Sequence, residues 1–194
     1  MKKSALLIVD VQNDFCSGGA LPVPQGDQVV PVLNQYGRAF REAALAIFAS
    51  RDWHPSVTKH FKAYGGLWPP HCVQGTKGAE FHPKLSLAQA AILSKGMDPE
   101  KDSYSAFHAS TKEEVDFGAL LKQQGIQRLF VGGLATDYCV KHSVLDACRR
   151  GLETYVLEDA IRGVVLNAGD SERALREMKQ AGAKVIRFQK LDLS

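Results

Sequence analysis

The 194-residue sequence has few cysteines, and no two of them are spaced as Cys-x-x-Cys. That spacing would indicate a zinc ribbon or a thioredoxin-like redox site, so neither class is favoured. In a reducing compartment, free thiols are expected at all four positions, Cys16, Cys72, Cys139 and Cys148.

Long apolar runs and basic runs are also missing. No stretch approaches the roughly 20 apolar residues of a membrane span. The first apolar run ends at Asp10, which is too short for a signal peptide, and no small-residue cleavage site follows it. The net charge is only +3, and no cluster of Lys and Arg interleaves with aromatic residues. We therefore expect a cytoplasmic protein that uses neither nucleic acid nor membrane as a partner.

The composition is that of an ordinary globular protein, with 45% hydrophobic and 23% charged residues. The length fits one domain with a substantial core, and no repeat or linker divides the chain. We expect a single domain over residues 1–194. No apolar stripe indicates an oligomeric state.

Short apolar runs alternate with helix-like stretches along much of the chain. The runs are mostly continuous, which is typical of strands buried on both faces. Such alternation predicts an α/β fold, a single-domain three-layer sandwich with a mainly parallel, roughly six-stranded sheet flanked by helices. Glycines at 125, 151 and 182 close three helices. The expected strands are 5–11, 45–49, 90–93, 129–131, 154–157 and 184–188, and the expected helices are 27–43, 111–124, 137–150 and 171–180.

Two irregular stretches, 51–85 and 96–110, interrupt this rhythm. Loops this long in a compact domain are usually functional. In a parallel sheet the ligand lies beyond the carboxyl ends of the strands, so these loops are the expected place for it.

Cys139 follows a predicted strand and a glycine-rich turn and lies where a helix opens. A thiolate is stabilised at the positive end of a helix dipole, and backbone N–H groups of such a turn can hold an oxyanion. The segment therefore indicates covalent acyl-transfer chemistry with Cys139 as nucleophile.

Asp10 and Lys95 also lie at or just beyond predicted strand ends, so a parallel sheet would bring them to the edge where Cys139 lies. Asp10 could take the thiol proton and pass it to a leaving amine. Lys95 could hold Asp10 ionised and Cys139 as thiolate through its charge. Taken alone, Asp10 could equally cap a turn, and Lys95 could lie on the surface.

A carboxylate and several imidazoles lie in the first irregular stretch. Asp52 and His54 point to the same side of an extended segment, and His71 would complete a set of two His and one carboxylate, which suits zinc, iron or manganese. His60 is a fourth candidate, with loop capping as the alternative. We expect only packing or capping roles at four other positions, His82, His108, His142 and Cys148.

Six segments together resemble the nicotinamidases of the isochorismatase-like cysteine hydrolases. The resemblance runs in order over almost the whole chain, and its segments are 10–15 (DVQNDF), 51–55 (RDWHP), 68–76 (WPPHCVQGT), 95–96 (KG), 102–107 (DSYSAF) and 133–140 (GLATDYCV).

The resemblance implies hydrolysis of nicotinamide to nicotinate and ammonia in NAD salvage, with pyrazinamide as a second substrate. It implies the triad Asp10, Lys95 and Cys139. It also implies a cis peptide bond between Leu134 and Ala135, which turns the Ala135 N–H toward the Cys139 N–H to form an oxyanion hole.

One divalent metal ion is also implied by the resemblance, with zinc first and iron or manganese as alternatives. Its ligands would be Asp52, His54 and His71; some members place a fourth ligand at the position of His60, which is left open. The metal would orient the substrate ring. Phe15, Trp68 and Tyr104 match aromatic positions around that ring, with Ala135 also contacting the substrate.

Three other readings remain. A sibling amidohydrolase acting on carbamoyl or ureido compounds would share the triad and generally lack the metal cluster. Isochorismatase itself would lack the nucleophilic cysteine. A non-catalytic thiol or metal-binding protein, such as a redox sensor, would cycle with oxidant and show no amidase turnover.

Overall fold

The computed structural model describes residues 2–193 and contains one six-stranded sheet in the order β3-β2-β1-β4-β5-β6. All five neighbouring pairs are parallel. The strands are β1 (Ser4–Val9), β2 (Ala46–Asp52), β3 (Ala90–Lys95), β4 (Arg128–Leu134), β5 (Glu153–Arg162) and β6 (Lys184–Ile186). The predicted α/β fold with a mainly parallel sheet is therefore confirmed, and the described sheet is wholly parallel.

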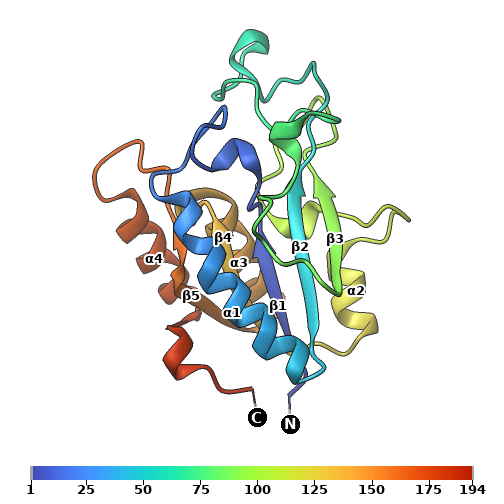
Figure 1. The fold of residues 1–194 in the computed structure, drawn as a ribbon, viewed down its shortest axis with the longest axis vertical. Helices are drawn as coiled ribbons and strands as arrows, with labels where there is room; N and C mark the ends of the chain where they lie inside the picture. The colour runs from blue at the N-terminus through green and yellow to red at the C-terminus, as the bar shows by residue number, and fades with distance from the viewer. Residues whose placement is uncertain (1, 194) are drawn as a thin grey trace.

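Helices cover both faces of the sheet (Figure 1). α1 (Val29–Glu42) packs on one face, against strand residues such as Leu6 and Ile8. The other face carries α2 (Phe117–Gln123), α3 (Lys141–Arg149) and α4 (Asp170–Gln180), packed against the alternate residues Leu7 and Val9. Because β1 is buried on both faces, its sequence is continuously apolar, as predicted.

The strand order changes direction between β1 and β4. The chain first adds strands on one side of β1, as β2 and β3, and then on the other side, as β4, β5 and β6. In open α/β sheets, ligands bind beyond the carboxyl ends of the strands at such a switch point. Figure 1 shows the segment after β2 rising over this edge, at the top of the view.

One helix prediction is wrong in its first half. Residues 111–124 were expected to be helical, but α2 begins only at Phe117. Thr111 instead opens a tight turn in which its N–H donates to the Val115 carbonyl, and Glu114 adopts a left-handed backbone with φ of 63°. Asp116 caps the helix because its side chain accepts from the Ala119 N–H at 2.8 Å. A good N-cap residue thus sets the start of the helix six residues later than expected.

The other predicted helices are present with small changes. Residues 136–140 form a single π-helical turn that leads into α3, so the expected helix from residue 137 has an irregular first turn. The three glycines predicted to close helices, at 125, 151 and 182, all have positive φ. Within residues 2–193, no helix combines the length and apolar character that crossing a membrane requires.

Candidate active site

Four polar side chains from four strand ends meet at the switch point. Asp10 follows β1, Asp52 ends β2, Lys95 ends β3, and Cys139 lies in the π-helical turn after β4. All four are at least 94% buried. The structure therefore brings together the three residues that the sequence placed at strand ends, and adds Asp52 to the same cluster.

Lys95 is the centre of this cluster. Its Nζ lies 2.9 Å from Asp10 Oδ2 and 3.4 Å from Cys139 Sγ, and it also donates to Asp52 Oδ1 and to the Ser103 carbonyl. β3 is two strands away from β1, roughly 10 Å at the usual spacing, so only a long side chain can bridge the gap. Burial lowers the pKa of Lys95, but the charges of Asp10 and Asp52 outweigh it, so the pKa lies well above the usual value and the ammonium persists.

Asp10 is held in a fixed orientation by its neighbours. Its backbone is left-handed, with φ of 48°, and its N–H donates to the Ser50 carbonyl at 3.1 Å. Ser50 Oγ donates to Asp10 Oδ1 at 2.6 Å. Burial raises the pKa of Asp10 despite the opposing effects of Lys95 and Ser50. A carboxyl group with a raised pKa can both accept and return a proton near neutral pH.

The electrostatics of Cys139 differ from the expected preformed thiolate. Burial raises the pKa of the Cys139 thiol well above its usual value, and Lys95 opposes this without prevailing because Asp10 and Asp52 add to the rise. A charged sulfur is costly in a buried site that already contains two carboxylates. These surroundings favour the neutral thiol of Cys139, so its attack requires a base.

A cluster of histidines adjoins these residues. One ring nitrogen from each of His54, His60 and His71 lies within 4.8 Å of the others. Asp52 Oδ2 is 3.7 Å from His54 Nε2. His60, which the sequence left open, lies within this cluster of three imidazoles, and Asp52 adjoins the cluster beside His54.

The other ring nitrogens of the three histidines are engaged outside the cluster. His54 Nδ1 is 2.9 Å from the Gly96 carbonyl, His71 Nδ1 is 2.8 Å from the Pro69 carbonyl, and His60 Nδ1 bonds the Asp102 carboxylate. Ligating imidazoles almost always bond in this way, because it fixes the tautomer and the ring orientation.

Two further observations fit a metal at this point. His54 Nε2 is a buried polar atom without a hydrogen-bond partner. Burial lowers the pKa of His71 to about 4, which keeps its imidazole neutral as metal binding requires. Only glycine fits at position 96, because a Cβ there would lie 2.5 Å from His54 Cε1 and would clash with the imidazole ring.

A small cavity of about 30 Å³ joins the thiol to the histidine cluster. Its lining includes both Cys139 and the metal-ligand candidates, together with aromatic and aliphatic side chains. The lining residues are Phe15, Leu21, Asp52, His60, Trp68, His71, Tyr104, Ala135, Tyr138, Cys139 and Val164. One bound molecule could thus contact the sulfur at one end and the histidine cluster at the other.

The aromatic walls of the cavity support one another. Trp68 Nε1 donates to Tyr104 Oη at 3.0 Å, and the Trp68 ring packs edge-on against Tyr138 with centroids 4.9 Å apart. The Phe15 ring lies 5.4 Å from that of His71. The three aromatic residues that the sequence placed near a substrate ring therefore line one cavity, and Tyr138 is an addition.

The backbone beside Cys139 has the expected irregularity. The Leu134–Ala135 peptide bond is cis, and the Ala135 carbonyl accepts from the N–H groups of Tyr138 and Val140. Asp137 accepts from the N–H groups of Val164 and Val165, which carries Val164 to the cavity wall.

Sequence reasoning missed the residues that orient the cluster. Gln12 is fully buried and exchanges two hydrogen bonds with the Asp52 backbone, 2.8 Å each, which fixes β2 against β1. Ser50 and Asp102 were equally unassigned. Gln12 and Asp102 lie in segments that carry the family resemblance. Ser50 is a small polar residue within an apolar strand, and this was the signal in the sequence that could have indicated a functional role.

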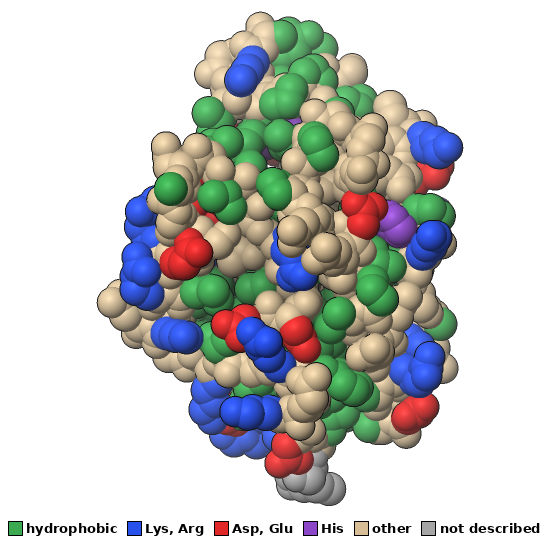
Figure 2. Space-filling model, turned by 60° about the vertical axis from the view of Figure 1, so that its left-hand side comes forward, with side chains coloured by type: hydrophobic (Ala, Val, Ile, Leu, Met, Phe, Trp, Pro, Cys, Tyr) green, Lys and Arg blue, Asp and Glu red, His purple; other side chains and the backbone are tan. Residues whose placement is uncertain are grey.

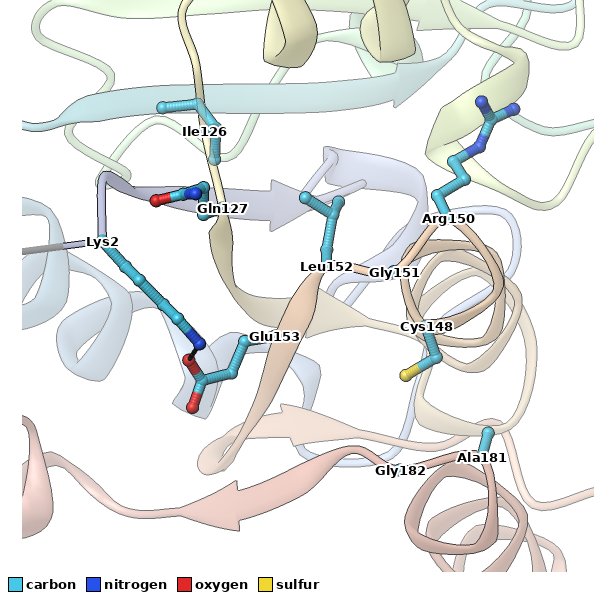
Figure 3. Close-up of a pocket in the computed structure, with 10 residues that line it drawn as sticks. All are labelled: Lys2, Ile126, Gln127, Cys148, Arg150, Gly151, Leu152, Glu153, Ala181 and Gly182. Atoms are coloured by element: carbon cyan, nitrogen blue, oxygen red, sulfur yellow. Dashed lines mark hydrogen bonds and ion pairs between the residues drawn. The ribbon is translucent and has the colours of Figure 1, made fainter.

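The histidines and the cysteine that were expected to have only packing or capping roles lie apart from the cluster or pack beside it. His142 stacks on Tyr104 with ring centroids 5.3 Å apart, and His108 is exposed. Cys148 lines a different hollow at the amino ends of the strands, drawn in Figure 3, where Lys2 pairs with Glu153. His82 is the exception and is taken up below.

Comparison with known proteins gives a consistent result. The family model for the Isochorismatase domain matches residues 4–190. The chain is 42% identical over 200 residues to a nicotinamidase of Escherichia coli, which covers 94% of each chain. It is 39% identical over 188 residues to a nicotinamidase/pyrazinamidase of Mycobacterium tuberculosis, covering 94% of this chain and 97% of the other.

A solved structure is similar over nearly its full length. The pyrazinamidase of Pyrococcus horikoshii in complex with zinc superposes with a TM-score of 0.87 at 46% identity, covering 96% of this chain and 99% of that one.

Proposed function

This chain belongs to the isochorismatase domain family, and from that premise we propose that it is an amidohydrolase that converts nicotinamide to nicotinate and ammonia. The relatives at about 40% identity support this activity, and pyrazinamide follows as a second substrate from the same relatives. The product serves NAD salvage.

The observation that carries the proposal is the shared cavity. Cys139 and the candidate metal ligands Asp52, His60 and His71 line the same small space. A pyridine carboxamide has a reactive carbonyl at one end and a ring nitrogen at the other, so it matches a thiol facing a metal site. A carbamoyl or ureido substrate would make no use of the histidines.

The first half of the reaction forms a thioester. Asp10 takes the Cys139 proton, and the sulfur attacks the amide carbon. The Ala135 and Cys139 N–H groups would donate hydrogen bonds to the carbonyl oxygen as it becomes negatively charged. Asp10 then protonates the departing amine, and ammonia leaves.

The second half restores the enzyme. Asp10, again ionised, takes a proton from a water molecule, which attacks the thioester carbon. The carbon–sulfur bond breaks, nicotinate forms, and the proton returns to the thiol. Lys95 stays charged throughout and offsets the negative charge that passes between Asp10 and Cys139.

Asp52, His54, His60 and His71 would hold one divalent metal ion. Zinc suits the imidazole-rich set, and the Pyrococcus pyrazinamidase was solved with zinc. When bound, the metal supplies an electrophilic contact for the substrate ring nitrogen and thereby orients the ring. Phe15, Trp68 and Tyr104 line the cavity that would hold the ring.

The test compares nicotinamide with benzamide, which has the same amide but no ring nitrogen. We expect ammonia release from nicotinamide and pyrazinamide by zinc-loaded protein, and a loss in kcat/KM of at least about 100-fold for benzamide, the scale of a lost orienting contact. Equal turnover of the two amides would contradict ring orientation by the metal. Release only from carbamoyl compounds would contradict the proposed substrate class.

A further inference from the structure

A second cluster of ligating side chains lies outside the candidate active site. Cys16, Asp27 and His82 each offer one ligand atom, and the three atoms lie within 4.8 Å of one another. His82 Nε2 is 3.4 Å from Asp27 Oδ1. None of the three lines the cavity that contains Cys139, and all three line a separate groove of about 520 Å³.

Hydrogen bonds hold the cluster in place. Asp27 Oδ2 accepts from the Ser17 N–H at 3.0 Å, which leaves Oδ1 directed at His82. The His82 N–H donates to the Val11 carbonyl at 2.9 Å, and the Cys16 N–H donates to the Asn13 carbonyl at 3.1 Å. Ligands whose backbones are already fixed need little ordering when an ion binds.

The arrangement suits a metal better than a catalytic triad. In a Cys-His-Asp triad the carboxylate orients the imidazole through one nitrogen while the other faces the sulfur. Here His82 Nδ1 accepts from the Lys84 N–H at 3.2 Å, so Nε2 is the nitrogen that faces Asp27. Burial, together with the charge of Asp27, raises the pKa of the Cys16 thiol to about 12, so a bound ion must displace its proton. The resulting thiolate, an imidazole and a carboxylate around one point are ligands that zinc accepts.

We propose that Cys16, Asp27 and His82 form a second divalent-metal site, of the zinc class, with water from the groove as the fourth ligand. Cys16 is 2% exposed, whereas the Asp27 and His82 side chains are 44% and 14% exposed, so the site is open on one side. An ion there ties residues 13–28 to residues 77–83.

Binding of a metal ion at the second site costs one hydrogen bond, and this cost makes its affinity lower than that of the candidate active-site metal site. Binding at His82 Nε2 moves the ring proton to Nδ1, and the hydrogen bond from the Lys84 N–H is then lost. The candidate active-site histidines carry no such conflict, because their outer nitrogens face a carbonyl or a carboxylate. The second site therefore binds more weakly and loses its ion first during chelation.

The position of the site links it to the substrate cavity. Cys16 directly follows Phe15, which lines that cavity and lies against His71. An ion on Cys16 restrains the 3-10 turn Asn13–Phe15 and hence the Phe15 wall. Zinc at the second site should therefore raise thermal stability while leaving the reacting groups untouched.

Cobalt provides a direct test because a thiolate ligand adds a sulfur-to-cobalt absorption band. The candidate active-site metal set contains no thiolate, so we expect that band from the second site alone. Metal-free protein is titrated with Co²⁺ and, separately, with Zn²⁺ followed by elemental analysis. Wild-type protein should bind one more ion per chain than Cys16→Ser and should show the band, which Cys16→Ser lacks.

Two variants serve as controls, and a third repeats the test at a different ligand. Cys139→Ala and Cys148→Ser should keep both the band and the ion count. His82→Gln should weaken binding in the same way as Cys16→Ser, and it keeps the test decisive if the serine variant folds poorly. One ion per chain in wild type without the band, or a band lost in Cys139→Ala and kept in Cys16→Ser, would overturn the proposal.

Discussion

The two ends of the sheet contain the same kinds of ion pair in opposite surroundings. At the carboxyl end, Lys95 pairs with Asp10 and Asp52, and the three side chains are 0–6% exposed. At the amino end, beside the hollow of Figure 3, Lys2 and Lys184 pair with Glu153, and both lysines are more than half exposed.

The paired carboxylates Asp10 and Glu153 differ in burial, and their pKa values are shifted in opposite directions. Hydrogen bonds from Lys184 and Lys2 lower the pKa of Glu153 to about 2, so it stays an ordinary ionised carboxylate. Burial instead raises the pKa of Asp10 above its usual value, which favours its role in proton transfer. Figure 2 shows hydrophobic side chains grouped toward the upper end of one face, whereas Lys and Arg side chains are spread over that face and are most frequent in its lower half.

The largest expected difference in activity is between variants of Cys139, at the carboxyl end of the sheet, and of Cys148, at the amino end. Cys139→Ala should reduce kcat by at least about 10⁴-fold, since it removes the nucleophile and leaves only binding and oxyanion contacts. Cys148→Ser, at the amino end, should leave turnover of nicotinamide unchanged. Ammonia release measures both, and steady turnover by Cys139→Ala would refute the thioester route.

The two lysines separate a buried pair from an exposed one. Lys95→Met leaves two buried carboxylates without their cation and should cost about 3–5 kcal/mol in the free energy of unfolding. Lys2→Met removes a surface pair and should cost no more than about 1 kcal/mol in the free energy of unfolding. Urea unfolding at constant pH compares them. Equal costs would mean that burial does not govern the carboxyl-end cluster.

Two of the three carboxylates within residues 96–104 give an intermediate effect. Asp102 bonds His60 Nδ1, whereas Asp98 pairs with Lys101 at the surface. Asp102→Asn should weaken zinc binding by about 10-fold, the lower end of the range for partners of metal-ligating histidines. Asp98→Asn is the matched control and should leave the zinc affinity unchanged. Competition with a chelator measures both affinities, and an unchanged value for Asp102→Asn would place His60 outside the metal site.

The smallest effect concerns pH. Asp10 must be ionised to accept the thiol proton, so activity falls as the pH drops through its raised pKa, and the acid limb lies above that of an ordinary aspartate. Ser50 Oγ stabilises the ionised form, so Ser50→Ala should move the limb upward by about one pH unit or less. Ser94→Ala, whose hydroxyl accepts from Arg51, is the control. A limb that stays in place or moves downward would contradict the role of Asp10.

Much of the fold could be predicted because the pattern is local. Continuous apolar runs such as β1 predicted strands buried on both faces, and their parallel order predicted that Asp10, Lys95 and Cys139 would meet. The predicted start of α2 was wrong because the stretch before the N-cap residue Asp116 is also compatible with a helix. Local propensity cannot show which of several possible starts the tertiary structure selects.

The parts of the site that could not be predicted depend on long-range geometry. Lys95 by itself is typical of a surface residue, and its burial follows from the two-strand distance to Asp10. The sequence favoured a Cys139 thiolate because of the helix dipole and Lys95, whereas burial and the carboxylates of Asp10 and Asp52 raise the pKa of the thiol. His60 could not be assigned from spacing, since its place in the cluster depends on how residues 53–72 fold back over the sheet.

The site draws Asp10, Asp52, Lys95 and Cys139 from the ends of four strands, so it exists only when β1, β2, β3 and β4 have all been assembled into the sheet. A nascent chain that ends before β4 contains the metal ligands and the base but no nucleophile. No proteolytic fragment from either half can be active, and the thiol is enclosed by the same event that positions it. Turnover is therefore a global reporter of this protein's folding, and recovery of activity during refolding should follow the slowest step of sheet assembly.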